Sequence, residues 1–373
     1  MLKKKSKKIL SVFFINFLLT LLVVLVAELI FGNWIFGPKY SVLNIPRNEN
    51  RRFDVSKMMG PTTISYTRDK HGLRGDYSGD PKSIDVLVIG GSTTDEQFID
   101  DSATWVRQLE KQFHDNGNNL TVVNAGVDGQ STRGHVLAFE LWFPNVPNLR
   151  PKYVIAYIGI NDTTLGPERD LYDSMKSDEF MRRARYFIMN HSALYNQFRR
   201  IRGMLLAQRA QVIHGSKDMA SGKWVPVNET IDIEVLRKSV SLELKAYKSR
   251  LLRLINSIKA YGATPIFVTQ TRGDFRRHSD GLLSWIPDNQ EHPTNITSFN
   301  FQKLQLFNQV TLSVCRNIQI PCIDLGKEIK FTDGDFYDSI HTTPSGSYKI
   351  ATFLYDKLRI IVNKNHSLDL IKE

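Results

Sequence analysis

The stretch from Ile84 to Asp95 constrains the fold more than any other part of the chain. It begins with an apolar, β-branched run, IDVLVI, which ends at Gly90 and Gly91 and is followed by Ser92. An apolar run bounded by glycines is typical of a buried strand in a parallel sheet. Such sheets place their ligands at the carboxyl ends of the strands. The sequence therefore predicts a serine hydroxyl on a turn after a buried strand, although a plain helix-capping turn has the same pattern.

Two more strands with similar endings follow along the chain. Residues 120–125 lead into a loop that contains Gly129, and residues 153–158 lead into a loop that contains Asn161. A helix is predicted at 102–114, where apolar residues recur at i, i+4 and i+8. The alternation of strands and helices predicts a parallel α/β sheet. Because the carboxyl ends of parallel strands share one edge, we expect both loops to lie near the serine.

A further pair of polar residues, Asp338 and His341, lies near the carboxyl terminus in the sequence DSIH. This spacing can place a carboxylate beside an imidazole, which are the orienting acid and general base of a serine hydrolase. The motif is short and arises often by chance, so its weight depends on the other blocks. His71 and His135 lack comparable partners in the sequence, and His292 is a less favoured candidate for the base.

In this order, the four blocks resemble those of the SGNH, or GDSL-like, hydrolase superfamily. Residues 90–92 match the nucleophile block, 123–129 the second block, 159–162 the GxND block, and 338–341 the DxxH block. The resemblance covers about residues 83–360. It implies a flavodoxin-like three-layer α/β/α fold, a serine esterase activity, and no metal or organic cofactor. Gly91 departs from the namesake motif, which has aspartate at this position.

The resemblance gives each matched residue a role. Ser92 is the predicted nucleophile, His341 the base that takes its proton, and Asp338 the group that orients the imidazole. The predicted oxyanion hole consists of the backbone amides of Ser92 and Gly129 and the side-chain amide of Asn161.

The amino terminus combines a cluster of lysines with an almost wholly apolar run from Ile9 to Phe31. At about 1.5 Å per residue, this run is long enough to cross a bilayer core of about 30 Å. A cleaved signal peptide is the alternative, but its apolar region is shorter, about 7–15 residues, and ends in a small-x-small site. The sequence favours a single-pass membrane anchor at 1–34, with the lysines in the cytoplasm and the rest outside.

The rest of the chain is expected to divide into a stalk or linker at 35–82, the hydrolase domain at 83–360, and a tail at 361–373. Residues from about 165 to 226 exceed what a βα connection needs, so we expect a helical insertion there. Its apolar stripe and nearby arginines fit a structural helical cap, or a lid or basic surface toward anionic headgroups or an acidic glycan. The stripe consists of Leu194, Phe198, Ile201 and Leu205. The loop 271–297 follows the fourth strand and is a candidate for substrate contact.

Composition limits the functional classes. The chain has a formal net charge of +11, but it lacks a basic stripe interleaved with aromatic residues, so nucleic acid is not an expected partner. Cys315 and Cys322 have no metal-type spacing, and they form either one disulfide or two separate buried thiols.

The sequence therefore favours a membrane-tethered carboxylic-ester hydrolase that faces the periplasm or the cell surface. The expected substrate is an O-acetyl group on an extracytoplasmic polysaccharide. The anchor and the compartment suggest the polysaccharide, whereas the motifs indicate only ester chemistry. The alternatives are an O-acyltransferase with the same triad, a lipase-like esterase, and a non-catalytic glycan-binding assembly factor.

Overall fold

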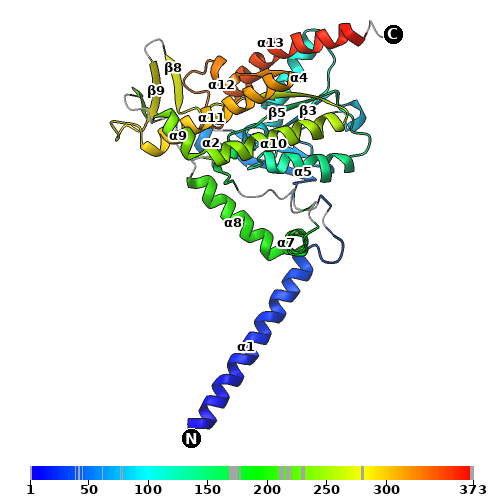
Figure 1. Ribbon diagram of the computed structural model, residues 1–373, viewed down its shortest axis with the longest axis vertical. Coiled ribbons are helices and arrows are strands. Elements are labelled where there is room, and N and C mark those ends of the chain that lie inside the picture. Colours follow the sequence, from blue (N-terminus) through cyan, green and yellow to red (C-terminus); the bar gives the residue numbers. More distant parts are fainter. Residues whose placement is uncertain are drawn as a thin grey trace. The chain divides into compact units, whose positions relative to one another are not determined.

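The computed structural model describes residues 2–369, except for 38, 41–42, 44, 61, 76, 78, 168–174, 176–177, 210–213, 216–218, 220, 228–231 and 279–280. The predicted insertion and tail therefore lie partly outside the described residues. The chain forms two compact units (Figure 1). The first unit comprises Met1–Asn44 and Arg169–Met204, and the second comprises Ile45–Glu168 and Leu205–Glu373.

A five-stranded parallel sheet forms the centre of the second unit. Its strands are β3 (Val86–Gly90), β4 (Val122–Asn124), β5 (Tyr153–Tyr157), β7 (Thr264–Val268) and β10 (Cys322–Ile323). They lie in the order β4–β3–β5–β7–β10, which is the 2-1-3-4-5 order of a flavodoxin-like sheet. The strand order reverses between β3 and β5, and such a switch point is where α/β sheets bind ligands.

Helices cover both faces of this sheet, so the predicted three-layer α/β/α fold is confirmed (Figure 1). One layer contains α4 (Trp105–Asp115) and α13 (Pro344–Asp369), and the other contains α5 (Thr132–Leu141), α10 (Ser241–Ala260) and α11 (Asn295–Ile318). Apolar residues of α4 and α13 share one core with the strands, including Leu109, Leu354 and Val88. Shorter elements are α3 (Ser92–Asp95), α9 (Ile233–Ser239), α12 (Leu325–Glu328), and the 3-10 turns Pro81–Ser83, Asp101–Ala103, Phe143–Asn145 and Asn161–Thr164.

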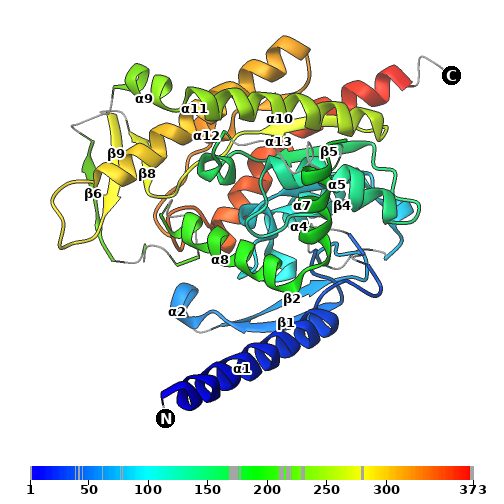
Figure 2. The same cartoon turned by 60° about the horizontal axis from the view of Figure 1, so that its bottom comes forward.

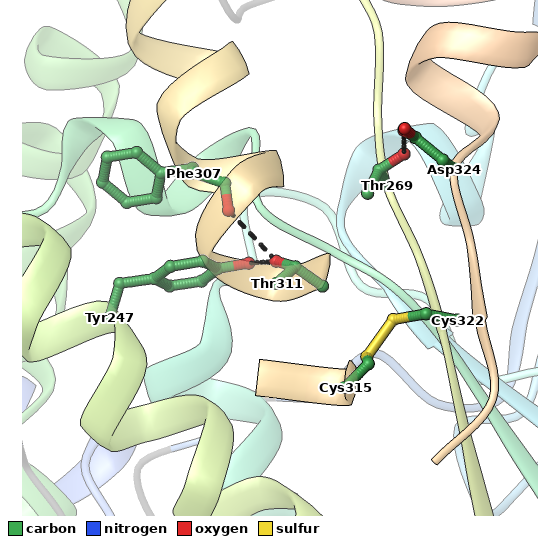
Figure 3. Close-up of a disulfide and its surroundings, with 7 residues drawn as sticks. All are labelled: Tyr247, Thr269, Phe307, Thr311, Cys315, Cys322 and Asp324. Carbon is green, nitrogen blue, oxygen red and sulfur yellow. Dashed lines mark hydrogen bonds between the residues drawn. A yellow bond between two sulfur atoms is a disulfide. The ribbon is translucent and has the colours of Figure 1, made fainter. Parts of the chain in front are cut away.

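The edge strand β10 is fixed to its neighbours by a covalent bond and by a hydrogen bond. Cys315, near the end of α11, forms a disulfide with Cys322 at the start of β10 (Figure 3). Next to it, the Thr269 hydroxyl donates a hydrogen bond of 2.8 Å to Asp324. Of the two alternatives for the cysteines, the structure therefore has the disulfide.

The segment that the sequence predicts as a stalk is folded over much of its length. β1 (Glu49–Asp54) and β2 (Thr63–Arg68) form an antiparallel hairpin, with α2 (Ser56–Met59) between them. Leu73 is completely buried, and Arg74 forms backbone bridges to both Arg68 and Asn124. The prediction of an irregular linker is therefore wrong for β1 and β2, and the backbone bridges of Arg74 join this hairpin to the edge of the central sheet.

A second, smaller sheet includes part of the loop that the sequence places at 271–297. β8 (Phe275–His278) and β9 (Gly281–Ile286) form a hairpin, and β6 (Lys223–Pro226) pairs with the other edge of β9 (Figure 2). Trp285 is buried in this sheet, whereas His292 is exposed beyond it.

The first unit contains three long helices, α1 (Leu2–Phe31), α7 (Phe180–His191) and α8 (Ala193–Arg209), the last of which continues past Met204 into the second unit. The segment Ser11–Phe31 of α1 is long and apolar enough to cross a membrane, with a mean hydropathy of 2.6. None of this segment is buried inside the protein, as expected for a helix surrounded by lipid.

Candidate active site

The nucleophile turn lies at the switch point of the sheet, directly after β3. Ser92 begins the short helix α3 and is buried. An added Cβ at Gly90 would lie 2.1 Å from the Thr94 hydroxyl and 2.8 Å from the Tyr157 carbonyl oxygen. Only glycine therefore fits where the chain leaves the strand, and this sharp exit holds the serine at the sheet edge.

Three side chains that are distant in the sequence meet at this turn. The Ser92 hydroxyl lies 2.8 Å from His341 Nε2, and His341 Nδ1 lies 2.7 Å from Asp338 Oδ2. An ionised carboxylate only accepts hydrogen bonds, so Nδ1 carries the imidazole proton and Nε2 accepts from the serine hydroxyl. In this tautomer His341 can remove the serine proton.

Burial and charge keep His341 neutral and Asp338 ionised, as a general base and its orienting acid require. Burial lowers the pKa of His341 below its ordinary value of 6.5, although the neighbouring Asp338 acts in the opposite direction. Burial raises the pKa of Asp338, but the charge and hydrogen bonds of His341 outweigh it, and the net pKa is lowered. Two backbone amides, of Ile340 and His341, also donate to the Asp338 carboxylate. At neutral pH the site therefore holds an ionised aspartate beside a neutral histidine.

The two other predicted oxyanion-hole residues come from loops at the same edge. The Asn161 side-chain amide donates to the Gln130 carbonyl oxygen at 3.0 Å, and its nitrogen lies only 2.1 Å from where a Cβ on Gly91 would be. An amide nitrogen carries two N–H groups. Among the described residues the Asn161 amide uses one of them, so the other can donate to a ligand oxygen. Gly129 has a left-handed φ of 68°, and Val127, in the same loop, donates its N–H to the Gly90 carbonyl oxygen.

A buried ion pair that sequence reasoning missed supports the nucleophile turn. Arg68, at the end of β2, donates to Asp95 at 2.7 Å, and both side chains are buried. The same guanidinium donates to the carbonyl oxygens of Gly72 and Gly126. Arg68 therefore connects the hairpin, the nucleophile helix and the loop after β4, which gives the folded stalk segment a structural role in the site.

Side-chain amides connect the remaining loops. Asn124 donates to the Thr94 carbonyl oxygen at 2.6 Å and accepts from the Gly126 N–H at 2.8 Å. Gln270 donates to the Thr93 hydroxyl at 2.8 Å and accepts from the Ile160 N–H at 2.6 Å. Asn124 belongs to a matched block, whereas Gln270 lies outside all four blocks, so no motif marked it.

His214, from the end of the predicted insertion, is a second histidine in the site. Its ring stacks on that of His341, with 3.9 Å between the ring centroids. Its Nδ1 lies 2.7 Å from the Tyr337 hydroxyl, and its Nε2 lies 3.8 Å from an Asp128 carboxylate oxygen. The next residue, Gly215, donates its N–H to Asp338 at 2.8 Å. No local pattern distinguishes this histidine, since its partners are all distant in the sequence.

A groove of about 720 Å³ lies beside this group. Two of its lining residues touch His214: Phe98 meets the ring edge-on at 4.9 Å, and Tyr337 bonds to it. The lining combines apolar, hydroxyl and carboxylate side chains, including Val55, Met58, Met59, Thr62, Thr63, Ile64, Asp100, Met219, Asp333, Phe336 and Ser345. Tyr337 therefore connects the groove to the His341 ring, on which it stacks at 5.7 Å between the ring centroids.

Three side chains beside Ser92 are spaced closely enough to hold a metal ion. Donor atoms of His214, Asp338 and His341 lie within 4.8 Å of one another. However, Asp338 and His341 bind each other, and the outer nitrogen of His341 binds Ser92. Two of the three donor residues are therefore already engaged in the chain of hydrogen bonds from Asp338 through His341 to Ser92. His292 is exposed, and His135 is buried in α5, where burial lowers its pKa to about 3; neither joins the site.

This fold and this site define a serine ester hydrolase of the SGNH class. The chain belongs to the GDSL-like lipase/acylhydrolase family, whose sequence profile matches residues 88–348. The matched span includes the end of β3, the nucleophile turn and the DxxH motif.

Several solved structures are similar to the chain at low identity. TesA has 14% identity and a TM-score of 0.38, and the aligned region covers 73% of this chain and 97% of TesA. The esterase EstA from Pseudoalteromonas sp., inhibited by monoethylphosphonate, has 11% identity and a TM-score of 0.40, covering 74% and 98%. A catalytic mutant of Axe2, an acetylxylan esterase from Geobacillus stearothermophilus, has 13% identity and a TM-score of 0.39, covering 72% and 91%. No curated protein matches the chain significantly.

Proposed function

We propose that the chain is a membrane-anchored esterase in which Ser92 is the nucleophile, His341 the base and Asp338 the orienting acid. The contact of 2.8 Å between the Ser92 hydroxyl and His341 Nε2 carries this proposal. A serine hydroxyl is a weak nucleophile at neutral pH, so it needs an adjacent neutral base. His341 is such a base, and Asp338 fixes its tautomer.

The reaction proceeds through an acyl-enzyme. The Ser92 oxygen attacks the acyl carbon while its proton moves to His341, and the carbonyl oxygen becomes an oxyanion that accepts from the amides of Ser92, Gly129 and Asn161. Collapse breaks the bond to the alcohol oxygen, which takes the proton from His341. A water molecule then attacks the acyl carbon while its proton moves to His341. Collapse of the second tetrahedral intermediate breaks the bond to the Ser92 oxygen, which takes this proton back from His341, and the acid leaves.

The anchor is part of the same proposal. α1 has the length and hydropathy of a membrane-spanning helix, and its Glu28 carboxylate accepts hydrogen bonds from Ser192, Ala193 and Leu194. A cleaved signal peptide would take these acceptor oxygens away, so the contacts support an uncleaved anchor. The lysines in the first turns of α1, before its apolar segment, favour a cytoplasmic amino terminus. The Cys315–Cys322 disulfide suits an oxidising compartment on the other side.

We infer that the substrate is an O-acetyl group on an extracytoplasmic polysaccharide. The placement outside the membrane supports a surface or secreted glycan. The groove beside His214 also supports it, because aromatic rings such as Phe98 can stack on sugar rings while carboxylates such as Asp333 accept from sugar hydroxyls.

The experiment compares full-length variants purified in detergent, with aryl esters of increasing acyl length and acetylated glycans as substrates. Ser92→Ala is expected to lower kcat by at least about a thousandfold, and Asn161→Ala by about a hundredfold or more. Ser313→Ala, which removes an exposed serine of α11, is the matched control and should have no effect.

Full activity in Ser92→Ala would overturn the catalytic assignment. Acetate release that is limited to simple aryl esters, or a preference for long acyl chains, would contradict the glycan substrate. Acetate release that falls when a sugar acceptor is added, with the acceptor becoming acetylated, would identify an acyltransferase instead of a hydrolase.

A further inference from the structure

The helices α7 and α8 expose apolar residues that a water-facing helix rarely carries. Along α7, Phe180, Met181, Phe187 and Ile188 fall on one face, and they are 45–79% exposed. The predicted stripe of α8 is exposed in the same way, with Phe198 at 65%. The first unit by itself therefore leaves both apolar faces uncovered.

The charge of these helices has a single sign. Together α7 and α8 carry seven arginines and no aspartate or glutamate. Arg182, Arg183 and Arg185 belong to α7, and Arg199 and Arg200 to α8. Apolar residues on one face and basic residues beside them are typical of helices that lie in the interface of an anionic membrane.

The junction between the two helices is attached to the end of α1. The Glu28 carboxylate accepts from the Ser192 hydroxyl at 2.7 Å and from the backbone N–H groups of Ala193 at 2.9 Å and Leu194 at 3.0 Å. It therefore caps the start of α8. The Asn33 N–H also donates to the His191 carbonyl oxygen at 2.8 Å.

These contacts fix the junction at the level of the last turn of the apolar helix. The apolar segment ends at Phe31, and Trp34, whose ring lies 5.5 Å from that of His191, follows directly. Tryptophan is enriched at the membrane–water interface. The end of α7 and the start of α8 therefore meet where the hydrocarbon core gives way to the lipid headgroups.

We propose that α7 and α8 lie in the headgroup layer of the bilayer that α1 crosses, with their apolar stripes toward the acyl chains and their arginines bound to anionic phospholipid headgroups. This inference rests on the proposed membrane anchor. It assigns the insertion a lipid partner, whose negative charge complements the arginines and whose hydrocarbon covers the exposed stripes.

The experiment uses the full-length protein reconstituted into vesicles, with one cysteine introduced at a time and labelled with an environment-sensitive fluorophore. The native cysteines are bonded to each other and do not take the label. Phe198→Cys probes the stripe, Gly203→Cys probes the opposite side of α8, where an added Cβ meets no atom within 4 Å, and Leu22→Cys probes the anchor. Nitroxide-bearing lipids serve as quenchers.

In vesicles of phosphatidylcholine and phosphatidylglycerol in equal parts, we expect the label at 198 to be quenched severalfold more than the label at 203. We expect the difference to shrink in vesicles of phosphatidylcholine alone, and in a variant with Arg199, Arg200 and Arg202 changed to glutamine.

Each other outcome overturns a defined part of the proposal. If the lipid quenchers did not quench the label at position 22, the membrane anchor itself would be refuted. Quenching at position 22 without quenching at position 198 would refute the placement of α7 and α8 in the headgroup layer but leave the anchor intact. The apolar stripe would then contact protein, glycan or water instead of lipid. Equal quenching at 198 in both kinds of vesicle would refute the binding of anionic headgroups.

Discussion

The missing side chain at position 91 makes room for Asn161. The namesake motif of the family has aspartate at this position, but here a Cβ would lie 2.1 Å from the Asn161 amide nitrogen. Glycine at this position and the asparagine therefore form one packed unit beside the nucleophile.

This packing predicts the effect of a single methyl group. Gly91→Ala should push the Asn161 amide away from the oxyanion and lower kcat by about tenfold or more, since one such donor accounts for about a hundredfold. Steady-state kinetics on an aryl ester checks this, with Gly203→Ala as the control. Because the two residues act together, Gly91→Ala should cause little further loss in an Asn161→Ala background; independent, multiplying losses would contradict the explanation.

His214 gives a second prediction at the residue level, concerning pH. Burial lowers the pKa of His341, and the charge of protonated His214 lowers it further. His341 works as a base only when neutral, so activity falls as the pH drops through its pKa, and the acid limb of kcat/KM should lie below 6.5. His214→Phe keeps a stacked ring without the charge, so the pKa of His341 should rise and the acid limb should move to higher pH.

Tyr337→Phe is the matched control for this profile. It removes the same 2.7 Å hydrogen bond between Tyr337 and His214 but leaves the His214 imidazole in place. Its acid limb should therefore stay where it is in the natural protein. An acid limb that moves equally in both variants would show that the hydrogen bond, and not the charge, sets the profile.

At the level of elements, the β1–β2 hairpin is a part of the catalytic fold. Its contacts with the nucleophile helix include the buried pair of Arg68 and Asp95, and the Tyr66 hydroxyl also donates to Asp95. Removing Arg68 leaves the buried Asp95 with the more distant Arg74, 4.0 Å away, as its ion-pair partner, and breaking a buried pair costs up to about 3–5 kcal/mol. An exposed pair on the same hairpin, Arg51 with Glu49, contributes at most about 1 kcal/mol.

We therefore expect Arg68→Met to lower the midpoint of thermal unfolding by several degrees and Arg51→Met to leave it nearly unchanged. Tryptophan fluorescence of the detergent-solubilised protein gives the measurement. Adding Asp95→Asn should restore part of the stability that Arg68→Met loses. If Arg68→Met alone were as stable as the natural protein, the hairpin would not depend on this pair.

The same hairpin shows why part of the fold could not be predicted. Ile64, Tyr66 and Arg68 are the buried residues of β2, so the strand does alternate. The alternation is not recognisable in the sequence because Arg68 is charged, and its burial depends on Asp95, 27 positions away. By contrast, β3 is buried on both faces, and its apolar run is visible in the sequence without any knowledge of its neighbours.

At the level of the whole molecule, site residues that belong to a sequence motif could be predicted. Site residues that only the folded chain brings close could not. Ser92, Asp338, His341 and Asn161 could be predicted because their types and order form a known pattern, and the structure brings them together at one sheet edge. His214 could not, since a histidine in an insertion has no pattern until the chain has folded. The groove depends on such long-range neighbours too.

The cap that Glu28 provides also guides the preparation of a water-soluble form. A chain shortened just after α1 would keep the donors of Ser192, Ala193 and Leu194 but lose the carboxylate that accepts from them. It would also keep the exposed stripes without a membrane to cover them, which favours aggregation. A soluble version should instead begin near Ile45 and replace 169–204 with a short flexible linker, so that both pieces of the first unit leave together.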